Sequence, residues 1–481
     1  MENSLRSQTL KSVAWSAIER FSVQIFQFLF SIILARLVSP SEFGLIAMLG
    51  IFIVIAQSFV ESGFSNALIQ KTNRSEEDYS TVFYFNIAIA VIIYICLFYA
   101  ASSIALFYKE PLLEIVCKWF GLSVIFQSFS VVQIAKLTVS LDFKTQAKAS
   151  FISVLISGIV GVGLAYYGFG VWALLVQNLI NTFFNTLLLW LFSRWVPLFS
   201  FSWKALKTLF SFSSKLLLSG LLHTLYVNLY SLVIGRKYTT VEVGFFNQSN
   251  LISRFPSVSL MAIISRAIYP IQCNIQDQNE LLSESFKKYL RMSCYIIFPI
   301  MISIGVLAKP LILVVLTAKW SPMSTILTIL CFSYMWIPIM VVNNQILNVT
   351  GRSDFFLKAE IIKKIFGLLI LFISIPFGIT WICIGIFIYN FIDILIITQY
   401  SKKVIQTNIL IQLKSILPIL LLSIIMGIGI YATMLLQKNP YWQIFFGSLV
   451  GILTYIFLSA VLKVKEFYFL KSILYKFIHK I

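Results

Sequence analysis

Polar side chains recur at helical spacing inside segments of this sequence that are otherwise apolar. Arg20 and Gln24 stand one helical turn apart, as do Asn250 and Arg254, so each pair lies on one face of a helix. A guanidinium binds phosphate oxygens in a bidentate fashion and loses its water more readily than an ammonium does. The two pairs therefore predict a water-filled, cationic cavity for an anionic ligand, and a phosphate or pyrophosphate on a lipid carrier would fit it.

The two pairs belong to longer stripes on the first and eighth expected helices, and the second and seventh carry similar stripes. We expect these four helices to form the walls of the cavity. A charge in the middle of a membrane span costs about 2.5–3.5 kcal/mol on insertion scales, so such groups normally face protein or water. The stripes contain Ser16, Arg20, Gln24, Gln27 and Ser31; Gln57, Glu61 and Ser65; Lys215, Ser219, His223, Tyr226 and Tyr230; and Asn247, Asn250, Arg254 and Ser257.

We expect Arg20, Arg254 and Glu61 to touch the substrate, with Gln24, Asn250 and His223 as further candidates for substrate binding. In the alternative interpretation, Arg20 or Arg254 pairs with Glu61 or Glu19 and holds helices together. His223 is a candidate proton-sensitive group, although a lone histidine on a helix is more often a packing residue. Asn390 and Asp393 add a polar pair on the twelfth expected helix, and Lys363 and Lys364 are expected to extend to lipid headgroups.

The composition places these residues in a membrane protein. The chain has 481 residues, of which 59% are hydrophobic and 11% are charged, with a mean hydropathy of +0.91. A soluble domain carries roughly 25% charged residues. Apolar runs long enough to cross a hydrocarbon core of about 30 Å as a helix recur from end to end, which predicts an all-α integral membrane fold.

We expect about fourteen spans. They lie at residues 12–36, 43–63, 80–107, 112–139, 145–168, 170–193, 206–235, 245–272, 285–308, 323–350, 355–376, 379–400, 414–436 and 441–462.

One short motif occurs twice, and it indicates an internal duplication. "ARLVSPSEFG" holds Arg36, Glu42 and Gly44, and "GRKYTTVEVG" repeats the same three residue types at the same spacing 200 positions later. We expect each copy to form the outer corner between the first two helices of a lobe. In the second copy, Arg236 and Glu242 would then have the same gate or structural role as Arg36 and Glu42, and we assign Arg266 to the same group.

Six helices in each repeat is an even number, so both repeats enter the membrane from the same side, as parallel repeats do in transporters. Rocking of one lobe against the other would open the space between them to either face of the membrane, which is alternating access. The expected organisation is an N-terminal six-helix lobe at 1–200, a C-terminal six-helix lobe at 201–405, an additional helix pair at 406–462 and a basic tail at 463–481.

The net charge of +19 predicts an orientation rather than a nucleic-acid partner, because an excess of Lys and Arg marks the cytoplasmic loops of membrane proteins. With the N-terminus inside, most basic residues fall in inner loops. The tail "KVKEFYFLKSILYKFIHK" alternates lysines with apolar residues, which suits an amphipathic segment on an anionic inner leaflet; a frayed terminus is the alternative. Both termini are therefore expected to be cytoplasmic.

Motifs for chemistry are absent. The sequence contains no G-x-x-x-x-G-K-[ST] site for ATP, no paired-carboxylate or Asp-rich motif in the short outer loops, and no C-x-x-C pair. These features predict a protein that is not an enzyme and that holds no metal or cofactor. We expect coupling to a proton or sodium gradient as the driving force.

The stretch "ILARLVSPSEFGLIAM", followed by "FVESGFSNALIQKTNRSEEDYSTVFYFN", resembles the polysaccharide-transporter branch of the MOP flippase superfamily, of the Wzx or colanic-acid-exporter type. The resemblance continues through "LDFKTQAKA", "YYGFGVWALLVQNL", "NLYSLVIGR" and "IISRAIYPIQ", and it covers roughly residues 5–405. Positions that match charged positions of the family are Arg36, Glu61, Arg236, Arg254 and Arg266. Tyr230 departs from the family, which often has Asp at this position. This difference weakens the proposal that the seventh helix carries an ion-coupling carboxylate.

The resemblance implies a two-lobed, MATE-like or MOP-like protein of the bacterial inner membrane. It would move a polyprenyl-pyrophosphate-linked oligosaccharide, such as an O-antigen, capsule or exopolysaccharide repeat unit, from the cytoplasmic to the periplasmic leaflet. Expected partners are that glycolipid, membrane lipids, a polysaccharide polymerase and chain-length proteins.

Three alternatives remain open at this point. A MATE-like drug or metabolite antiporter would favour cationic ligands and a cavity rich in carboxylates, whereas here the arginines favour an anion. A polysaccharide polymerase or ligase would need an outer-face catalytic site. A major-facilitator carrier would carry a Gly/Asp/Arg signature that "SNALIQKTNRSEED" lacks.

Overall fold

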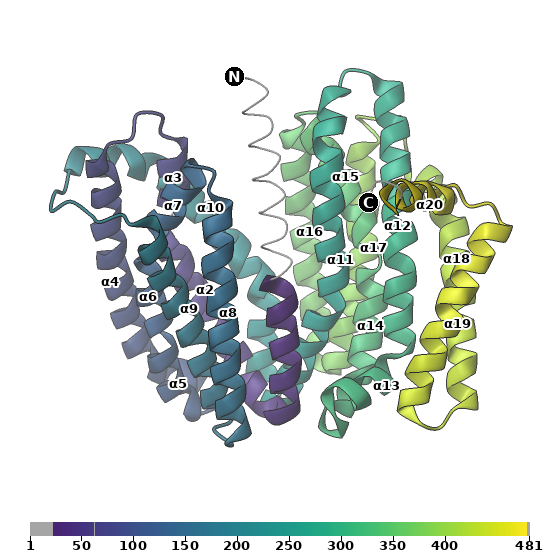
Figure 1. The fold of residues 1–481 in the computed structure, drawn as a ribbon, viewed down its shortest axis with the longest axis horizontal. Helices are drawn as coiled ribbons and strands as arrows, with labels where there is room; N and C mark the ends of the chain where they lie inside the picture. The colour runs from purple at the N-terminus through teal and green to yellow at the C-terminus, as the bar shows by residue number, and fades with distance from the viewer. Residues whose placement is uncertain (1–22, 62, 479–481) are drawn as a thin grey trace. The chain divides into compact units, whose positions relative to one another are not determined.

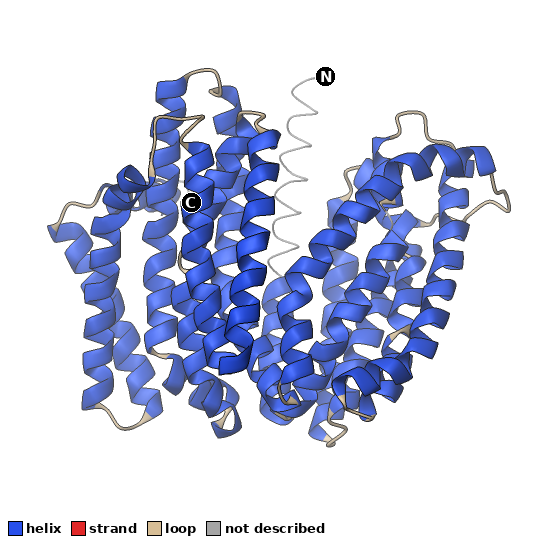
Figure 2. Cartoon of the chain, turned by 180° about the vertical axis from the view of Figure 1, so that it is seen from behind, coloured by secondary structure: helices blue, strands red, loops and turns tan. Residues whose placement is uncertain are grey.

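The computed structural model describes residues 23–61 and 63–478, and within them the chain forms helices and loops with no strand (Figure 2). Contacts divide the chain into two compact units, which we call unit 1 (Met1–Gly244) and unit 2 (Phe245–Ile481). The boundary falls inside α11 (Thr240–Asn274), whose first turn belongs to unit 1.

Among the described residues, unit 1 contains the helices α2 to α10 (Figure 1), and a short apolar helix precedes them. They are Val23–Leu37, α2 (Pro40–Glu61), α3 (Phe64–Gln70), α4 (Glu76–Tyr108), α5 (Leu112–Phe120), α6 (Leu122–Ser128), α7 (Val131–Val139), α8 (Phe143–Tyr166), α9 (Val171–Ser193) and α10 (Trp203–Lys237).

Unit 2 begins with most of α11, and α20 is its last described helix (Figure 1). Its further elements are α12 (Asn279–Val306), α13 (Ala308–Leu311), η1 (Ile312–Leu316), η2 (Ala318–Met323), α14 (Ser324–Tyr334), α15 (Ile337–Val349), α16 (Ser353–Ser374), η3 (Ile375–Phe377), α17 (Ile379–Ser401), α18 (Ile409–Leu436), α19 (Pro440–Val461) and α20 (Lys465–Ile478).

The chain is an all-α, multi-pass membrane protein. Each expected span coincides with helix over the part that the structure describes. Eleven helical stretches in the described chain are long and apolar enough to cross a membrane, so the number fourteen is not confirmed. The helix Val23–Leu37, α10 and α16 occupy the other three expected places, and α16 carries five charged side chains.

The duplicated corners are helix N-termini closed in the same way. At the start of α2, the Ser39 hydroxyl and backbone N–H donate to Glu42 Oε2 at 2.6 and 2.8 Å. At the start of α11, the Thr239 hydroxyl and backbone N–H donate to Glu242 Oε2 at 2.9 and 3.0 Å. Each glutamate lies three residues after the capping residue, which is the geometry of a capping box. The repeated glutamate therefore satisfies backbone donors that a helix start leaves open.

The fourth and tenth expected spans break at matching places. α6 ends at Ser128 and α7 begins at Val131, while α14 ends at Tyr334 and α15 begins at Ile337. Broken helices at corresponding positions of two halves are a feature of transporters with internal repeats. This match supports the duplication that the sequence predicts, although the repeat boundary near residue 200 differs from the division into compact units.

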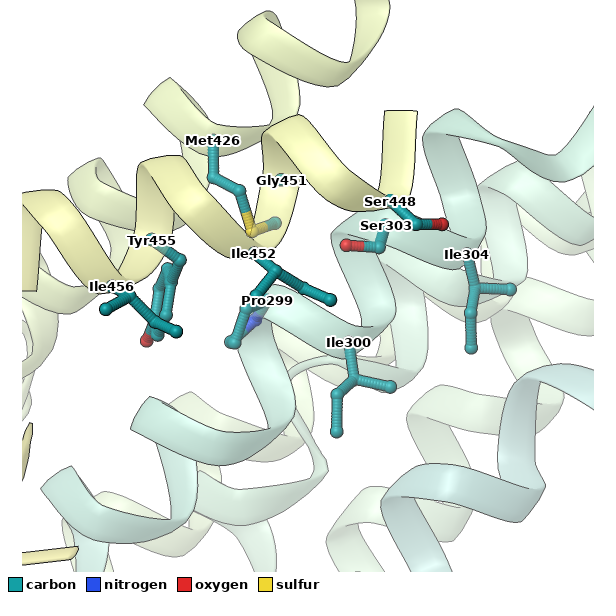
Figure 3. Close-up of a pocket in the computed structure, with 10 residues that line it drawn as sticks. All are labelled: Pro299, Ile300, Ser303, Ile304, Met426, Ser448, Gly451, Ile452, Tyr455 and Ile456. Atoms are coloured by element: carbon teal, nitrogen blue, oxygen red, sulfur yellow. The ribbon is translucent and has the colours of Figure 1, made fainter. Parts of the chain in front are cut away.

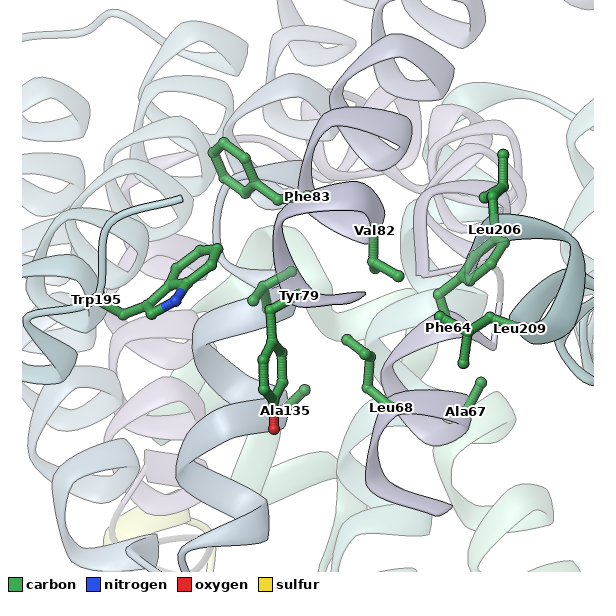
Figure 4. Packing of buried hydrophobic residues seen from close by; sticks show 11 residues of the cluster. Phe64, Ala67, Leu68, Tyr79, Val82, Phe83, Ala135, Trp195, Leu206 and Leu209 are labelled. Carbon is green, nitrogen blue, oxygen red and sulfur yellow. The ribbon is translucent and has the colours of Figure 1, made fainter. Parts of the chain in front are cut away.

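The core of unit 1 explains why α10 packs there. Figure 4 shows residues of α3, α4 and α10 packed together with Trp195 of the segment between α9 and α10. Trp195 Nε1 donates to Glu76 Oε2 at 2.7 Å, and the Leu198 backbone N–H donates to Ser80 Oγ at 2.8 Å. The connecting segment is thus held against α4, and α10 starts from it inside unit 1.

Two repeated glycines allow a close backbone approach within unit 1. A methyl group at Gly44 would overlap the carbonyl oxygen of Thr240, and one at Gly244 would overlap the carbonyl oxygen of Pro40. The contact is reciprocal, so α2 and the first turn of α11 meet at equivalent positions of the two corners. Any side chain at either glycine would push these backbones apart.

We predict that Gly44→Ala lowers the stability of the protein by about 1–3 kcal/mol, because the added methyl meets backbone that cannot rotate away. Gly50→Ala in the same helix is the matched control. The methyl group added at Gly50 would have no neighbouring atom within 4 Å beyond its own helix backbone. The Gly50→Ala variant should therefore be as stable as the unchanged protein, or more stable by about 0.5–1 kcal/mol. Thermal unfolding of both purified variants in one detergent measures the difference, and equal shifts would contradict the close approach.

Candidate functional site

A cation and two hydrogen-bonding groups meet in unit 2 between α11 and α14. Tyr334 Oη donates to Asn250 Oδ1 at 2.7 Å, and the guanidinium carbon of Arg254 lies 5.8 Å from the centroid of the Tyr334 ring. Asn250 and Arg254 are one turn apart on α11, as their spacing predicts, and they contact the same aromatic side chain. An arginine over an aromatic face keeps its in-plane N–H donors available for another ligand.

No carboxylate of the described chain forms an ion pair with Arg254. The side chain of Arg254 is exposed. Glu19 lies outside the described residues and Glu61 belongs to unit 1, so the alternative pairing of Arg254 with either glutamate stays a prediction. The Tyr334 ring holds the guanidinium of Arg254 in place, and the N–H groups of that guanidinium are charge-assisted donors. The arrangement can therefore bind an anion such as a phosphate.

A second polar group lies one residue away along α14 and connects to α17. Asn390 Nδ2 donates to Ser333 Oγ at 2.7 Å and to the Ser333 carbonyl oxygen at 3.0 Å. Asn390 is buried, and its amide therefore needs such partners. This bond fixes the end of α14 at the residue before Tyr334, so the aromatic platform of Arg254 is itself positioned.

A charged triad, with two of its three members buried, lies in the same unit between α16 and α17. Lys363 forms ion pairs with Glu360 and, at 3.3 Å, with Asp393. Lys363 is 2% exposed and Asp393 is 7% exposed. The expectation that Lys363 extends to lipid headgroups is therefore wrong, because the ammonium finds two carboxylates inside the protein. Ionisable groups buried within membrane helices are uncommon and often take part in ion or proton pathways.

An apolar groove of about 340 Å³ opens between α12 and the hairpin of α18 and α19 (Figure 3). Its walls are mostly aliphatic, with two serine hydroxyls and one tyrosine. The lining residues are Pro299, Ile300, Ser303, Ile304, Met426, Ser448, Gly451, Ile452, Tyr455 and Ile456. A groove of this composition suits an aliphatic chain rather than a polar ligand.

In unit 1, Glu61 lies at the end of α2, close to the end of the second expected span. Gly63 has a φ of 69°, which lets the chain turn before α3 begins. Gln127 Nε2 of α6 donates to Glu61 Oε1 at 2.8 Å. Glu61 is exposed and hydrogen-bonded to an amide, so its carboxylate can also accept from a ligand.

The corner residues divide into structural and surface groups. Glu42 and Glu242 serve as helix caps, and the exposed Arg236 stacks on Phe107 with 5.1 Å between the guanidinium carbon and the ring centroid. Arg36 is also exposed. The capping role explains the glutamates without a substrate, whereas a role of the arginines at a gate stays a prediction.

Four expected site residues are less informative. Arg20 lies outside the described residues, and the side chain of His223 is likewise outside the description. Gln24 and Arg266 are exposed on the helix Val23–Leu37 and on α11. Their proposed roles stay predictions.

Sequence reasoning missed Tyr334 and Glu360. The positions one helical turn from Tyr334 are not polar, so only its contacts with Arg254 and Asn250 identify it. Glu360 stands one turn before Lys363 on α16, and this spacing could have indicated an internal ion pair.

Two polysaccharide biosynthesis proteins resemble the chain in sequence over most of its length. The teichuronic acid biosynthesis protein TuaB of Bacillus subtilis is 26% identical over 471 residues, which cover 95% of this chain and 96% of that protein. The lipopolysaccharide biosynthesis protein WzxC of Escherichia coli is 23% identical and covers 75% of this chain and 80% of its own.

Solved structures share the fold. The lipid II flippase MurJ in an inward closed conformation matches 93% of this chain and 98% of its own, with a TM-score of 0.79 and 17% identity. An inward-facing multidrug resistance transporter of the MATE family of the MOP superfamily matches 80% of this chain and 97% of its own, with a TM-score of 0.61 and 14% identity. The expected MATE-like or MOP-like fold is confirmed.

The sequence model of one family decides the classification. It matches residues 33–325, more than half of the 481, and so includes both repeated corners, Asn250 and Arg254. The chain belongs to the polysaccharide biosynthesis protein family, and its fold is that of the MOP-superfamily transporters.

Proposed function

We propose that this protein moves a polyprenyl-pyrophosphate-linked oligosaccharide across the bacterial inner membrane, from the cytoplasmic to the periplasmic leaflet, by alternating access. The observation that carries this function is Arg254, a guanidinium within a membrane span that stacks on Tyr334 and has no carboxylate partner in the described chain. Such a group would bind the pyrophosphate. The names of WzxC and MurJ, a lipopolysaccharide biosynthesis protein and a lipid II flippase, support a lipid-linked glycan as the substrate.

The apolar groove between α12 and the α18–α19 hairpin would hold part of the polyprenyl chain. Its aliphatic walls would cover isoprene units, while Ser303 and Ser448 leave room because their side chains are small. Burying apolar surface contributes roughly 25 cal/mol per Å². The protein would thus bind the lipid and the headgroup at separate places in unit 2.

A MATE-like antiporter of cationic drugs is the main alternative, since the fold is shared with such a transporter. Arg254 argues against it, because an exposed guanidinium without a carboxylate repels a cation. A polymerase or ligase is less supported, since the residues gathered in the site bind and position rather than react. Under the proposal the protein is a transporter, both termini are cytoplasmic, and the polymerase and chain-length proteins act downstream.

The triad of Lys363, Glu360 and Asp393 is the proposed place of coupling to a cation gradient. Protonation of either carboxylate would weaken its pairing with the buried ammonium, so proton binding would alter the contact between α16 and α17. This role deepens the transport proposal and requires no bound cofactor.

The first prediction concerns Arg254. In a strain that lacks the gene, lipid-linked repeat units should accumulate on the inner leaflet. Arg254→Ala should lower the rescue by roughly tenfold or more, because a hydrogen bond to a charged group contributes about 1.5–3 kcal/mol. Arg352→Gln is the control, since that exposed arginine pairs with Asp354 outside the site. Full export by Arg254→Ala at equal protein level would remove Arg254 from the mechanism.

A second prediction compares adjacent residues of α19. Ser448→Trp should reduce transport by roughly tenfold, because the indole would occupy the groove. Fitting both the indole and the lipid chain there would cost about 1–3 kcal/mol. Leu449→Trp should leave transport unchanged, since Leu449 is 43% exposed and does not line the groove. Quantifying flipped glycolipid in vesicles measures both variants, and equal rates would show that the groove is not used.

The third prediction tests the triad. Lys363→Met should lower the free energy of unfolding by about 3–5 kcal/mol, because it leaves buried carboxylate charge without its cation. Adding Asp393→Asn should restore part of that stability. Transport by the double variant should no longer respond to an ionophore that collapses the proton gradient. Retained gradient dependence would show that the triad is structural only.

A further inference from the structure

A second cavity, of about 810 Å³, lies in unit 2 between α12, the start of α18 and the amphipathic helix α20. It shares no lining residue with the apolar groove. In Figure 1, α20 runs across α12 rather than along it, and the loop after α19 leads into α20. The cavity is therefore formed where an interfacial helix meets the ends of membrane helices.

One ion pair builds this cavity. Arg291 Nε and Nη2 of α12 donate to the two carboxylate oxygens of Glu466 on α20 at 2.5 and 2.9 Å, and Nη1 donates to the Ser415 carbonyl oxygen of α18 at 2.8 Å. Arg291 thus joins three helices. Glu466 is 8% exposed; burial raises its pKa, but the hydrogen bonds from Arg291 outweigh burial and hold the pKa below its usual value. The pair stays ionised at neutral pH.

The remaining charges of the cavity are not balanced. Five basic and two acidic residues line it. Glu466 neutralises Arg291, and Glu284 pairs with Lys288 at 2.8 Å. Lys287, Lys463 and Lys465 form no ion pair in the part of the chain that the structure describes, although the charge of Lys465 also acts on Glu466. Three ammonium groups, from α12, from the turn before α20 and from the first residue of α20, thus line one cavity and are available to an anion there.

The other walls of the cavity are apolar. Met292 and Pro418 come from α12 and α18, and Leu462, Val464 and Phe469 come from the turn and from α20. A small soluble anion would leave this surface unused, whereas an amphiphile would cover it with its acyl chains. The exposed Tyr468, Phe469 and Tyr475 give α20 the aromatic surface of a helix that lies in a membrane interface.

We propose that this cavity binds the headgroup of an anionic phospholipid, with the phosphate held by Lys287, Lys463 and Lys465. Basic pockets between membrane helices on the cytoplasmic side are suited to such headgroups. The bound lipid would fasten α20 to α12 and so stabilise the end of unit 2. This inference does not rest on the transport proposal, because it concerns a different cavity and a different lipid.

The test measures lipid binding to the full-length protein in a neutral detergent. Native mass spectrometry would compare phosphatidylglycerol with phosphatidylcholine of the same acyl chains, and thermal unfolding would be followed with each lipid or with inorganic phosphate. We expect phosphatidylglycerol to bind more tightly and to raise the unfolding temperature. The triple variant Lys287→Gln, Lys463→Gln, Lys465→Gln should lose roughly tenfold or more of that affinity.

Matched variants separate the site from general charge. Lys402→Gln, Lys414→Gln, Lys471→Gln removes the same charge from exposed positions of unit 2 that do not line the cavity, and it should retain the affinity. The charge-conserving variant Lys287→Arg, Lys463→Arg, Lys465→Arg should also retain the affinity for phosphatidylglycerol. Equal loss in both glutamine variants, equal binding of the two lipids, or full protection by inorganic phosphate alone would each overturn the lipid site.

Discussion

The hydrocarbon interior of a membrane offers no hydrogen-bond partner, and this constraint governs where each polar group of the protein can lie. Backbone groups are satisfied by helix, and the helix starts at Ser39 and Thr239 are closed by glutamates three residues later. Lys363 is buried because two carboxylates surround it. A polar group that is satisfied within the chain thus contributes to structure, and one that is left over is available to a ligand.

The same distinction separates the roles of the cations in unit 2. Arg291 and Lys363 are paired, and they join helices. Arg254 stacks on an aromatic ring without a carboxylate in the described chain, and Lys287, Lys463 and Lys465 line a cavity whose acidic residues are already engaged. Both unpaired groups combine positive charge with nearby apolar surface. They suit amphiphilic anions, in one case the proposed glycolipid and in the other a phospholipid.

Most of the fold could be predicted from the sequence because hydropathy and helical spacing are local properties. The spans coincide with helices, and the spacing of Asn250 and Arg254 correctly placed them on one face of α11. The family was also predicted, from the corner "ARLVSPSEFG" and the residues that follow it. The site was predicted less well, since Lys363 was assigned to the headgroups and Tyr334 was not recognised.

The sequence by itself determined that the chain is helical and membrane-spanning, that its corner is duplicated, and that cations outnumber carboxylates. These follow from residue type and from spacing along one helix. Only the tertiary structure decided which cations are neutralised, since the partners of Lys363 and Arg291 include Asp393 and Glu466 on other helices. The physical reason is that a charge pair depends on a few ångströms between side chains that lie up to 175 positions apart in the chain.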